Sequence, residues 1–410
     1  MLAFQKKLTN SFYVLLGLPA TAMGFGLSVQ IAVLSWILRT QYHLDIHEIG
    51  IVWAAGPIAG IIGQPIVGLI SDGVWFWGGR RRPFIFIGGL LAALSIFALP
   101  NIGFINHTLG IGSIMAVAVT VALTLDLSIN ISFNPTRAII ADVTPEGAPR
   151  TKGYTWMQAI SNFFGAGAYL VSALLGNFTL IYVGVAIVFL FSVIPMFFIE
   201  EPRKLENVET DHVKATRTDW NQLFRIYFAH AFSWLGIQTM FIYSFAFLEQ
   251  RFTADDHAYL GSVIGWSFFI LNAAGSVFPV VMLEPMAKKF GKVKTHLLSV
   301  ASMAAGYLLI AFFVKTTVMM YAVFVLLSIG WASVVSLPFA IMTEKVNKKR
   351  MGFFMGIFNL SVVLPQLVSS FVLGSYIQSA DNKSVIYIIS GISLAVSAVL
   401  WILVKEKKTK

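Results

Sequence analysis

Residues 185–199 read VAIVFLFSVIPMFFI, and residues 90–99 read LLAALSIFAL. Neither run alternates apolar and polar residues, as the strands of a membrane barrel would. Both therefore predict helices, and about 20 apolar residues suffice to cross a bilayer. Similar runs recur along the chain, so we expect an all-α polytopic membrane protein. Its twelve spans are expected near residues 12–38, 47–71, 83–104, 110–139, 154–176, 178–199, 223–249, 258–284, 295–314, 318–342, 353–378 and 384–404.

The composition supports this class and excludes others. Of the 410 residues, 57% are apolar and only 12% are charged, about half the ~25% typical of soluble domains. A soluble enzyme of this size needs a charged shell that this chain cannot supply. The chain has 0 Cys, which excludes disulfides, thiol catalysis and cysteine metal sites.

The distribution of basic residues predicts the topology. Of the 29 Lys and Arg residues, 25 fall in the termini and in the connections after even-numbered spans, and 4 fall on the other side. Cytoplasmic connections carry such an excess, so both termini are expected in the cytoplasm. The net charge of +10 is then explained by topology and anionic lipid, and nucleic acid is not an expected partner.

A weak internal sequence repeat divides the chain into two halves. The fourth span ends with Pro135, Ala138 and Asp142, and the tenth ends with a similar pattern in which Ala340 and Glu344 each lie 202 residues further on. The polar interval 201–222 reads as a cytoplasmic linker. We therefore expect a six-helix bundle over 1–200, a linker over 201–222, and a second six-helix bundle with a short basic tail over 223–410. Two pseudo-symmetric halves of this kind place a binding site between them.

Asp126 is the candidate coupling residue. It lies deep inside the fourth span, where a charged side chain costs about 2.5–3.5 kcal/mol on insertion scales. A carboxyl group there is neutral when occluded and ionised when open to water, which is the chemistry of a proton-coupling site. The other interpretation is a structural acid paired with a buried base, but no Lys or Arg lies comparably deep in the expected spans.

Amide side chains within the spans form a candidate substrate site. Amides both donate and accept hydrogen bonds, as sugar hydroxyls require, although each one taken singly is better explained as a contact between helices. Tryptophans offer flat faces for stacking on a sugar ring, although each is more often a packing residue. The candidate substrate-binding set is Gln30, Trp53, Asn130, Gln158, Asn162, Trp234, Trp266, Asn359 and Gln366.

Charged residues at the ends of the spans form a candidate gate. Asp72 lies at the end of the second span, a short stretch before Arg80, Arg81 and Arg82. An aspartate at a helix end can meet an arginine or the positive end of another helix dipole, and such a contact can latch one conformation. Arg137 and Asp142, at the end of the fourth span, complete the gating set; a plain basic loop is the alternative.

Several motifs have counterparts in a known family. The stretch from Trp53 through Gly56-Pro57 and Gln64-Pro65 to the arginines at 80–82 resembles the second span and following loop of plant sucrose transporters. Asp126 with Asn130, Asn162 with Gly165, the stretch 336–340, and Asn359 with Gln366 are similar to later spans of that family, and Gln30 is similar to a glutamine of its first span. The seventh span departs from the family because it lacks an aspartate near its outer end.

This resemblance implies the major facilitator fold and membership of the glycoside–cation symporters. It implies uptake of disaccharides with protons, and the acid that matches Asp126 is the family's proposed proton and sugar site. The sugar can be sucrose or a maltose-type glucoside. The short termini and central loop suggest a bacterial protein in the cytoplasmic (inner) membrane.

The expected function is therefore a proton-coupled disaccharide symporter that works by alternating access. A sodium-coupled sugar symporter and a proton-exchanging exporter of the same fold stay open as alternatives. An enzyme is not expected, because one isolated deep carboxylate provides no pair of catalytic groups, and the sequence has no GxxxxGK[ST], HExxH or Gly-x-Ser-x-Gly motif. No cofactor or metal is expected, and the partners are sugar, proton and lipid around a monomer.

Overall fold

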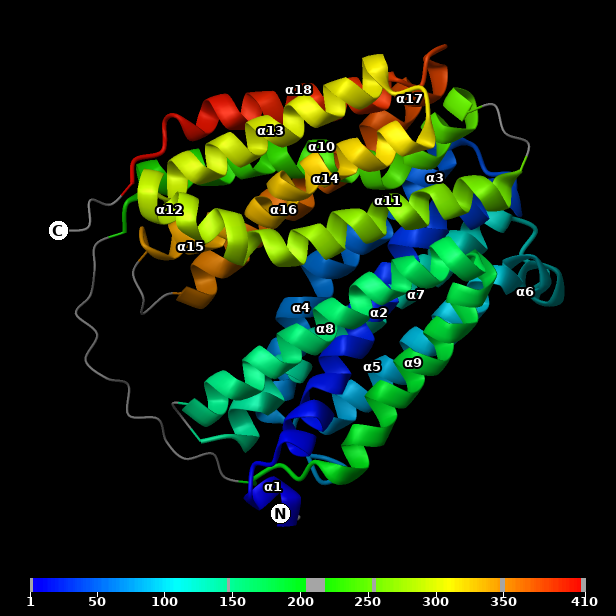
Figure 1. Cartoon of the computed structure of the whole chain (residues 1–410). Coiled ribbons are helices and arrows are strands. Elements are labelled where there is room, and N and C mark those ends of the chain that lie inside the picture. Colours follow the sequence, from blue (N-terminus) through cyan, green and yellow to red (C-terminus); the bar gives the residue numbers. More distant parts are fainter. Residues whose placement is uncertain (1–2, 146–147, 204–217, 253–255, 347–350, 407–410) are drawn as a thin grey trace. The chain divides into compact units, whose positions relative to one another are not determined.

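The structure is a computed structural model that describes residues 3–145, 148–203, 218–252, 256–346 and 351–406. Within these residues it is helical, without a named strand (Figure 1). Among the described residues, eleven helical stretches are long and apolar enough to cross a membrane, and the shorter apolar helix α18 (Val385–Trp401) supplies the twelfth span. The predicted all-helical, twelve-span fold is confirmed. Residues 204–217 of the expected linker lie outside the described residues.

The first six spans follow the predicted order with ends that differ by a few residues. The longest uninterrupted helices are α2, α7 and α8, and short helices precede the first span and extend the third. The elements are α1 (Ala3–Lys6), α2 (Asn10–Thr40), α3 (Ile46–Trp53), α4 (Ala55–Gly73), α5 (Arg82–Ala98), the 3₁₀ turn η1 (Leu99–Asn101), α6 (Ile102–Leu109), α7 (Ile114–Val143), α8 (Ala148–Leu175) and α9 (Asn177–Phe198).

The last six spans are more often interrupted. Two of them contain π-helical turns, and one is split into two helices. The elements are α10 (Trp220–Phe252), α11 (His257–Phe278), η2 (Pro279–Leu283), α12 (Glu284–Phe290), α13 (Lys292–Phe313), α14 (Thr317–Val334), α15 (Leu337–Thr343), α16 (Met351–Val368), η4 (Ser369–Leu373), α17 (Gly374–Ser379) and α18.

Two of the interruptions have the same cause. Pro57 has no N–H to donate to the carbonyl of Trp53, and the second span breaks between α3 and α4 at Ala54. Pro338 has no N–H to donate to the carbonyl of Val334, where α14 ends. Because proline has no N–H group, the span can bend at these carbonyls without leaving a backbone N–H group unpaired.

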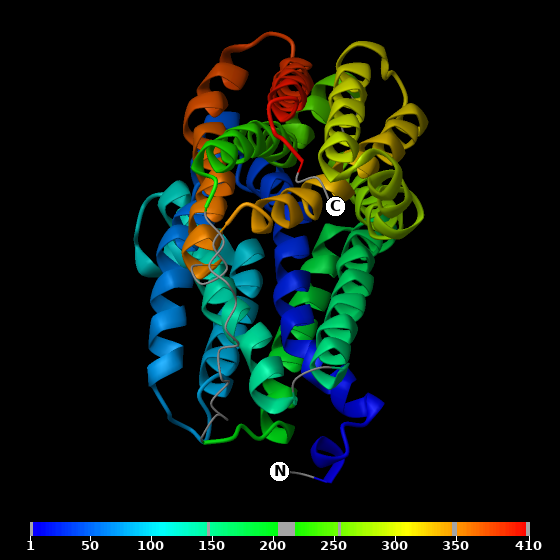
Figure 2. The ribbon, with the colours of Figure 1, turned by 90° about the vertical axis from the view of Figure 1, so that its left-hand side faces the viewer.

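Each half repeats one pattern of helix contacts. In the first unit α2 packs against α8 and α9, α5 packs against α7 and α9, and α4 packs against α7. In the second unit α10 packs against α16 and α18, α13 packs against α14 and α18, and α11 packs against α14. The contacts match span for span, so both halves use one packing plan. Figure 2 shows α10 of the second unit and α2 of the first from a direction at right angles to Figure 1.

The chain divides close to its centre into two compact units. One unit contains Met1–Leu44 and Ile51–Asn207, and the other contains Asp45–Gly50 and Val208–Lys410. The short segment Asp45–Gly50 belongs to the second unit because it contacts α17: the Ile46 N–H donates to Gln378 Oε1 at 2.9 Å, and His47 Nδ1 lies 2.9 Å from Ser375 Oγ. Each unit has its own core of buried apolar residues.

Candidate functional site

Asp126 lies in the interior of the first unit. It sits near the middle of α7 and is 6% exposed. Gln30 on α2, also buried, donates from Nε2 to Asp126 Oδ2 at 2.9 Å. Two helices whose residues are 96 positions apart in the sequence therefore build this polar pair.

Gly56 on α4 makes room for this carboxyl group. A Cβ atom at Gly56 would lie 3.4 Å from both carboxyl oxygens of Asp126. Seven residues later, a Cβ atom at Gly63 would lie 3.1 Å from the Cβ of Asn130. Residues seven apart lie two turns apart on nearly the same face of a helix, so a glycine-lined face of α4 packs against the face of α7 that carries Asp126 and Asn130.

The carboxyl group of Asp126 is not neutralised by a base in the described part of the chain. Within the described ranges, none of the ion pairs contains Asp126, and its side-chain hydrogen bond comes from an uncharged amide. The other amide atom of Gln30, Oε1, is buried without a partner among those residues. The Asp126–Gln30 pair thus combines a donor for an ionised carboxylate with an acceptor for a protonated one.

The predicted amide residues of the first unit other than Gln30 differ in exposure: one is half-buried and two are exposed. Asn130 donates from Nδ2 to the backbone carbonyl of Asp126 at 2.8 Å and is half-buried. Gln158 and Asn162 are exposed on α8, where Gln158 Nε2 donates to Asn162 Oδ1 at 2.8 Å. Both line an open groove of about 550 Å³ together with Tyr154 and Thr155.

Trp53, by contrast, is buried, and it lies at the end of α3. Its indole N–H donates to Ser35 Oγ at 2.8 Å. The structure therefore ties Trp53 to α2 in the same unit as Asp126.

In the second unit, Gln366 and Trp234 have defined partners. Gln366 on α16 donates from Nε2 to Oε1 of the buried Gln238 on α10 at 3.1 Å. Asn359 is half-buried seven residues before Gln366 on the same helix. Trp234 donates from its indole N–H to His230 Nε2 at 2.9 Å.

Trp234 and Trp266 also pack against aromatic rings. The Trp234 ring meets Trp331 edge to face with 6.2 Å between centroids, and Trp266 meets Phe269 at 5.9 Å. Both tryptophans stay half-buried, so part of each side chain is open to a ligand or to lipid.

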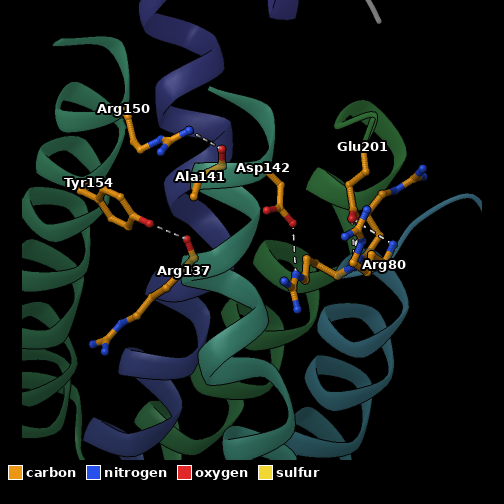
Figure 3. Close-up of polar contacts among 9 residues, drawn as sticks. Arg80, Arg137, Ala141, Asp142, Arg150, Tyr154 and Glu201 are labelled. Carbon is orange, nitrogen blue, oxygen red and sulfur yellow. Dashed lines mark hydrogen bonds and ion pairs between the residues drawn. The ribbon is translucent and has the colours of Figure 1, made fainter. Parts of the chain in front are cut away.

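Four of the predicted gating residues, Arg80, Arg81, Arg82 and Asp142, lie at one end of the first unit, and Figure 3 labels Arg80 and Asp142 among them. Arg81 Nε lies 3.1 Å from Asp142 Oδ2, and each side chain is 10% exposed. Glu201 accepts the backbone N–H groups of Arg80, Arg81 and Arg82 at 2.7–3.0 Å. These N–H groups precede or begin α5, where a carboxylate is stabilised by unpaired donors and by the helix dipole.

The remaining gating candidates take other positions. Figure 3 shows the Arg137 guanidinium pointing away from Asp142, and it lies 4.1 Å from the centroid of the Phe133 ring. The backbone carbonyl of Arg137 accepts the Tyr154 hydroxyl at 3.1 Å. Arg150 Nη2 donates to the carbonyls of Ala141 and Thr144, near the end of α7. The side chain of Asp72 lies outside what the structure describes.

Three residues of these sites were missed by reasoning from the sequence. Glu201 was assigned to the linker, because nothing local links it to arginines 119 to 121 residues away. Gly56 was noticed only as part of a motif, although its pairing with Gly63 seven residues on was a usable signal. Gln238 was not among the predicted substrate residues, because its contact with Gln366 depends on the packing of α10 against α16. Among the described residues, no group of three or more His, Asp or Glu side chains is placed to hold a metal.

The fold and the intramembrane acid define a transporter. The family model of the Major Facilitator Superfamily matches residues 16–370 and 247–410. The chain therefore belongs to the Major Facilitator Superfamily, and it is a multi-pass membrane transporter rather than an enzyme.

Within that superfamily, the chain is similar to plant sucrose transport proteins. It is 25% identical to Sucrose transport protein SUT2 of Oryza sativa subsp. indica, over 87% of this chain and 84% of the relative. It is 24% identical to Sucrose transport protein SUC4 of Arabidopsis thaliana, over 87% and 82%. The resemblance to a sucrose-transporter-like family is confirmed.

Solved structures show the same fold at low sequence identity. The nucleoside transporter NupG matches with a TM-score of 0.72 and 13% identity, over 98% of this chain and 100% of that chain. The xylose transporter XylE from E. coli, in an inward open conformation, matches with a TM-score of 0.70 and 15% identity, over 98% and 97%.

Proposed function

We propose that the protein is a proton-coupled symporter that imports a disaccharide of the sucrose or maltose type. The observation that carries the proposal is the buried Asp126 carboxyl group, whose described side-chain partner is the neutral amide of Gln30. The similarity to sucrose transport proteins supports a sugar as the substrate.

Asp126 is suited to carry one proton per cycle. An ionised carboxylate in the membrane interior is costly, so occlusion of the site favours the protonated form. Contact with water and the Gln30 N–H donor favours the ionised form. Asp126 takes a proton on the outer side, loses its charge, and releases the proton after the site opens to the cytoplasm.

The membrane potential acting on one proton provides enough energy to accumulate sugar. One charge moved through 100 mV is worth about 2.3 kcal/mol. A ratio of about 50 in sugar concentration corresponds to that energy, since 1.4 kcal/mol is a factor of ten. A pH gradient adds to this value.

The proposed sugar contacts are amides and tryptophans of each unit. Gln30 and Asn130 lie on the helices that carry the coupling pair, and Gln158 and Asn162 provide exposed amides on α8. Asn359 and Gln366 provide the corresponding groups on α16. Trp53, Trp234 and Trp266 supply apolar faces, and the indole N–H groups of Trp53 and Trp234 are already engaged within the protein.

The contacts around Arg81 and Asp142 act as a cytoplasmic latch. Arg80, Arg82 and Arg137 flank this latch, and Asp72 is its expected neighbour from the second span. The excess of basic residues in one set of connections supports cytoplasmic termini. We place the transporter as a monomer in the inner membrane of a bacterium.

The decisive experiment is the Asp126→Asn variant in proteoliposomes. Asn keeps the shape and can still accept from Gln30, so sugar counterflow without a gradient is expected to persist. Accumulation driven by a proton gradient should fall from as much as about 50-fold at 100 mV to no accumulation. The matched control is Asp256→Asn, because Asp256 Oδ1 caps α11 through the N–H groups of Ala258 and Tyr259, a role that Asn also fills.

Two further readouts separate the alternatives. Alkalinisation of the medium on adding sugar indicates symport, and acidification indicates an exchanging exporter. Dependence of uptake on sodium at fixed pH indicates a sodium-coupled transporter. Undiminished proton-driven accumulation by the Asp126→Asn variant would refute the assignment of Asp126.

A further inference from the structure

An apolar groove with a basic rim lies on the second unit, between the start of α10 and the end of α18. Its volume is about 590 Å³, and its lining consists of Trp220, Asn221, Phe224, Arg225, Phe228, Leu400 and Leu403. Phe224 is 65% exposed and Phe228 is 60% exposed. The helix α10 is long and apolar enough to cross a membrane and α18 is a shorter apolar helix, so these aromatic side chains face a hydrocarbon or interfacial environment.

Arg225 gives the groove a fixed positive charge. Its Nη1 atom donates to the carbonyl of Leu403 at 2.7 Å, which holds the guanidinium against the turn that follows α18. A guanidinium has five N–H donors, so this single bond leaves donors for an anion. Lys405 follows two residues after Leu403 and is exposed.

The nearby carboxylates are engaged with the protein backbone. Asp219, six residues before Arg225, accepts the Gln222 N–H at its Oδ1 atom. Glu406 accepts the Lys292 N–H. Among the described residues, the ion pairs do not include Arg225, and no acidic side chain lines the groove.

We propose that this groove binds an anionic phospholipid. The acyl chain lies against Phe224, Phe228 and Leu403, and the headgroup phosphate pairs with Arg225 and Lys405. Guanidinium groups bind phosphate strongly because the N–H fork matches its oxygens. Trp220 at the rim has the amphipathic character of residues at the boundary between headgroups and hydrocarbon. Charge complementarity favours an anionic lipid over a zwitterionic one, and basic pockets between spans on the cytoplasmic side bind such headgroups.

The position of Trp220 allows a direct test. The purified full chain is reconstituted in phosphatidylcholine vesicles that contain equal fractions of either brominated phosphatidylglycerol or brominated phosphatidylcholine. Bromine quenches nearby tryptophans, and the difference between the native chain and the Trp220→Phe variant isolates the emission of Trp220. We expect Trp220 to be quenched with about fivefold higher apparent affinity by the anionic lipid, since one basic residue near the surface contributes roughly that factor.

The charge variants decide the role of Arg225. Arg225→Gln should remove the preference for phosphatidylglycerol without changing quenching by brominated phosphatidylcholine, and Arg225→Lys should retain part of the preference. The matched control is Arg251→Gln at the opposite end of α10, because Arg251 also donates to a backbone carbonyl, that of Ala311. This control removes the same charge and should leave the preference intact.

Four outcomes would overturn the proposal. Equal quenching by both lipids would show a groove that takes any acyl chain. A preference that survives Arg225→Gln would place the headgroup elsewhere, and an equal loss in Arg251→Gln would reduce the effect to net charge. If neither brominated lipid quenches Trp220, protein covers the groove.

Discussion

Each half has a cluster of one basic and two acidic residues at the corresponding ends of its helices. The first unit has Arg81, Asp142 and Glu201, and the second has Lys292, Glu344 and Glu406. The two clusters differ in how far their side chains are buried and in how many N–H groups the last glutamate accepts. In the first, the Arg81 and Asp142 side chains are each 10% exposed, and Glu201 accepts three consecutive N–H groups. In the second, the paired Lys292 and Glu344 side chains are 42% and 32% exposed, and Glu406 accepts the N–H of Lys292. One packing plan therefore carries a buried ion pair in one half and a more exposed one in the other.

The two halves also differ at the position of Asp126. Ser328 lies 202 residues after Asp126, by the offset that relates Asp142 to Glu344. Each faces the second span of its own half: Asp126 lies against Gly56 of α4, and Ser328 donates to the carbonyl of Ile270 on α11. A hydroxyl group does not ionise near neutral pH, so at this pair of matched positions the first half carries an ionisable side chain and the second half carries a hydrogen-bonded hydroxyl.

The largest difference between the halves is expected in the free energy of unfolding that is lost when Glu201 or Glu406 is replaced by alanine. Glu201→Ala leaves three N–H groups at the start of α5 without their acceptor. Hydrogen bonds to charged groups contribute about 1.5–3 kcal/mol each and do not add fully, so we expect a loss of roughly 3 kcal/mol in the free energy of unfolding. The measurement is unfolding by SDS titration in mixed micelles.

Glu406→Ala is the matched variant for Glu201→Ala. Its carboxylate is exposed and accepts fewer bonds, so the expected loss is below about 1 kcal/mol. Equal losses in the two variants would contradict the claim that the cluster around Glu201 is the more stable one.

A smaller difference is expected between the two ion pairs. A double-mutant cycle with Arg81→Ala and Asp142→Ala should give a coupling energy of about 2 kcal/mol, because both side chains are largely withdrawn from water. The same cycle with Lys292→Ala and Glu344→Ala should give about 0–1 kcal/mol, since that pair is screened by solvent. Raising the salt concentration should weaken the second coupling more than the first, and the opposite order of salt effects would reject the comparison.

Most of the fold could be predicted from local sequence. Runs such as 185–199 mark spans because a bilayer demands a long apolar helix, and the offset between Asp142 and Glu344 marks the repeat. Pro57 and Pro338 mark two interruptions through their missing N–H groups. The π-helical turns Pro279–Leu283 and Ser369–Leu373 were not predicted, because a π turn depends on side-chain packing that composition does not record.

The candidate sites could be predicted less completely, and the reason is sequence distance. Asp126 stands out as a charge in an apolar run, which is a local signal. Its contact with Gln30 spans 96 residues, and the contact of Glu201 with Arg81 spans 120. Such contacts follow from how helices pack against one another, and the spacing of residues within one helix carries no information about them.

The smallest expected effect concerns Ser328, and it tests whether the two halves differ in function or only in stability. Ser328 Oγ lies 2.7 Å from the carbonyl of Phe324 and 3.2 Å from that of Ile270. A hydrogen bond of this kind within a membrane averages about 0.6 kcal/mol, so Ser328→Ala should lower stability by about that amount. It should leave proton-driven accumulation unchanged, because Ser328 carries no titratable group. A loss of coupling in Ser328→Ala that matches the loss in Asp126→Asn would mean that both halves take part in proton transfer, and the functional contrast between them would fail.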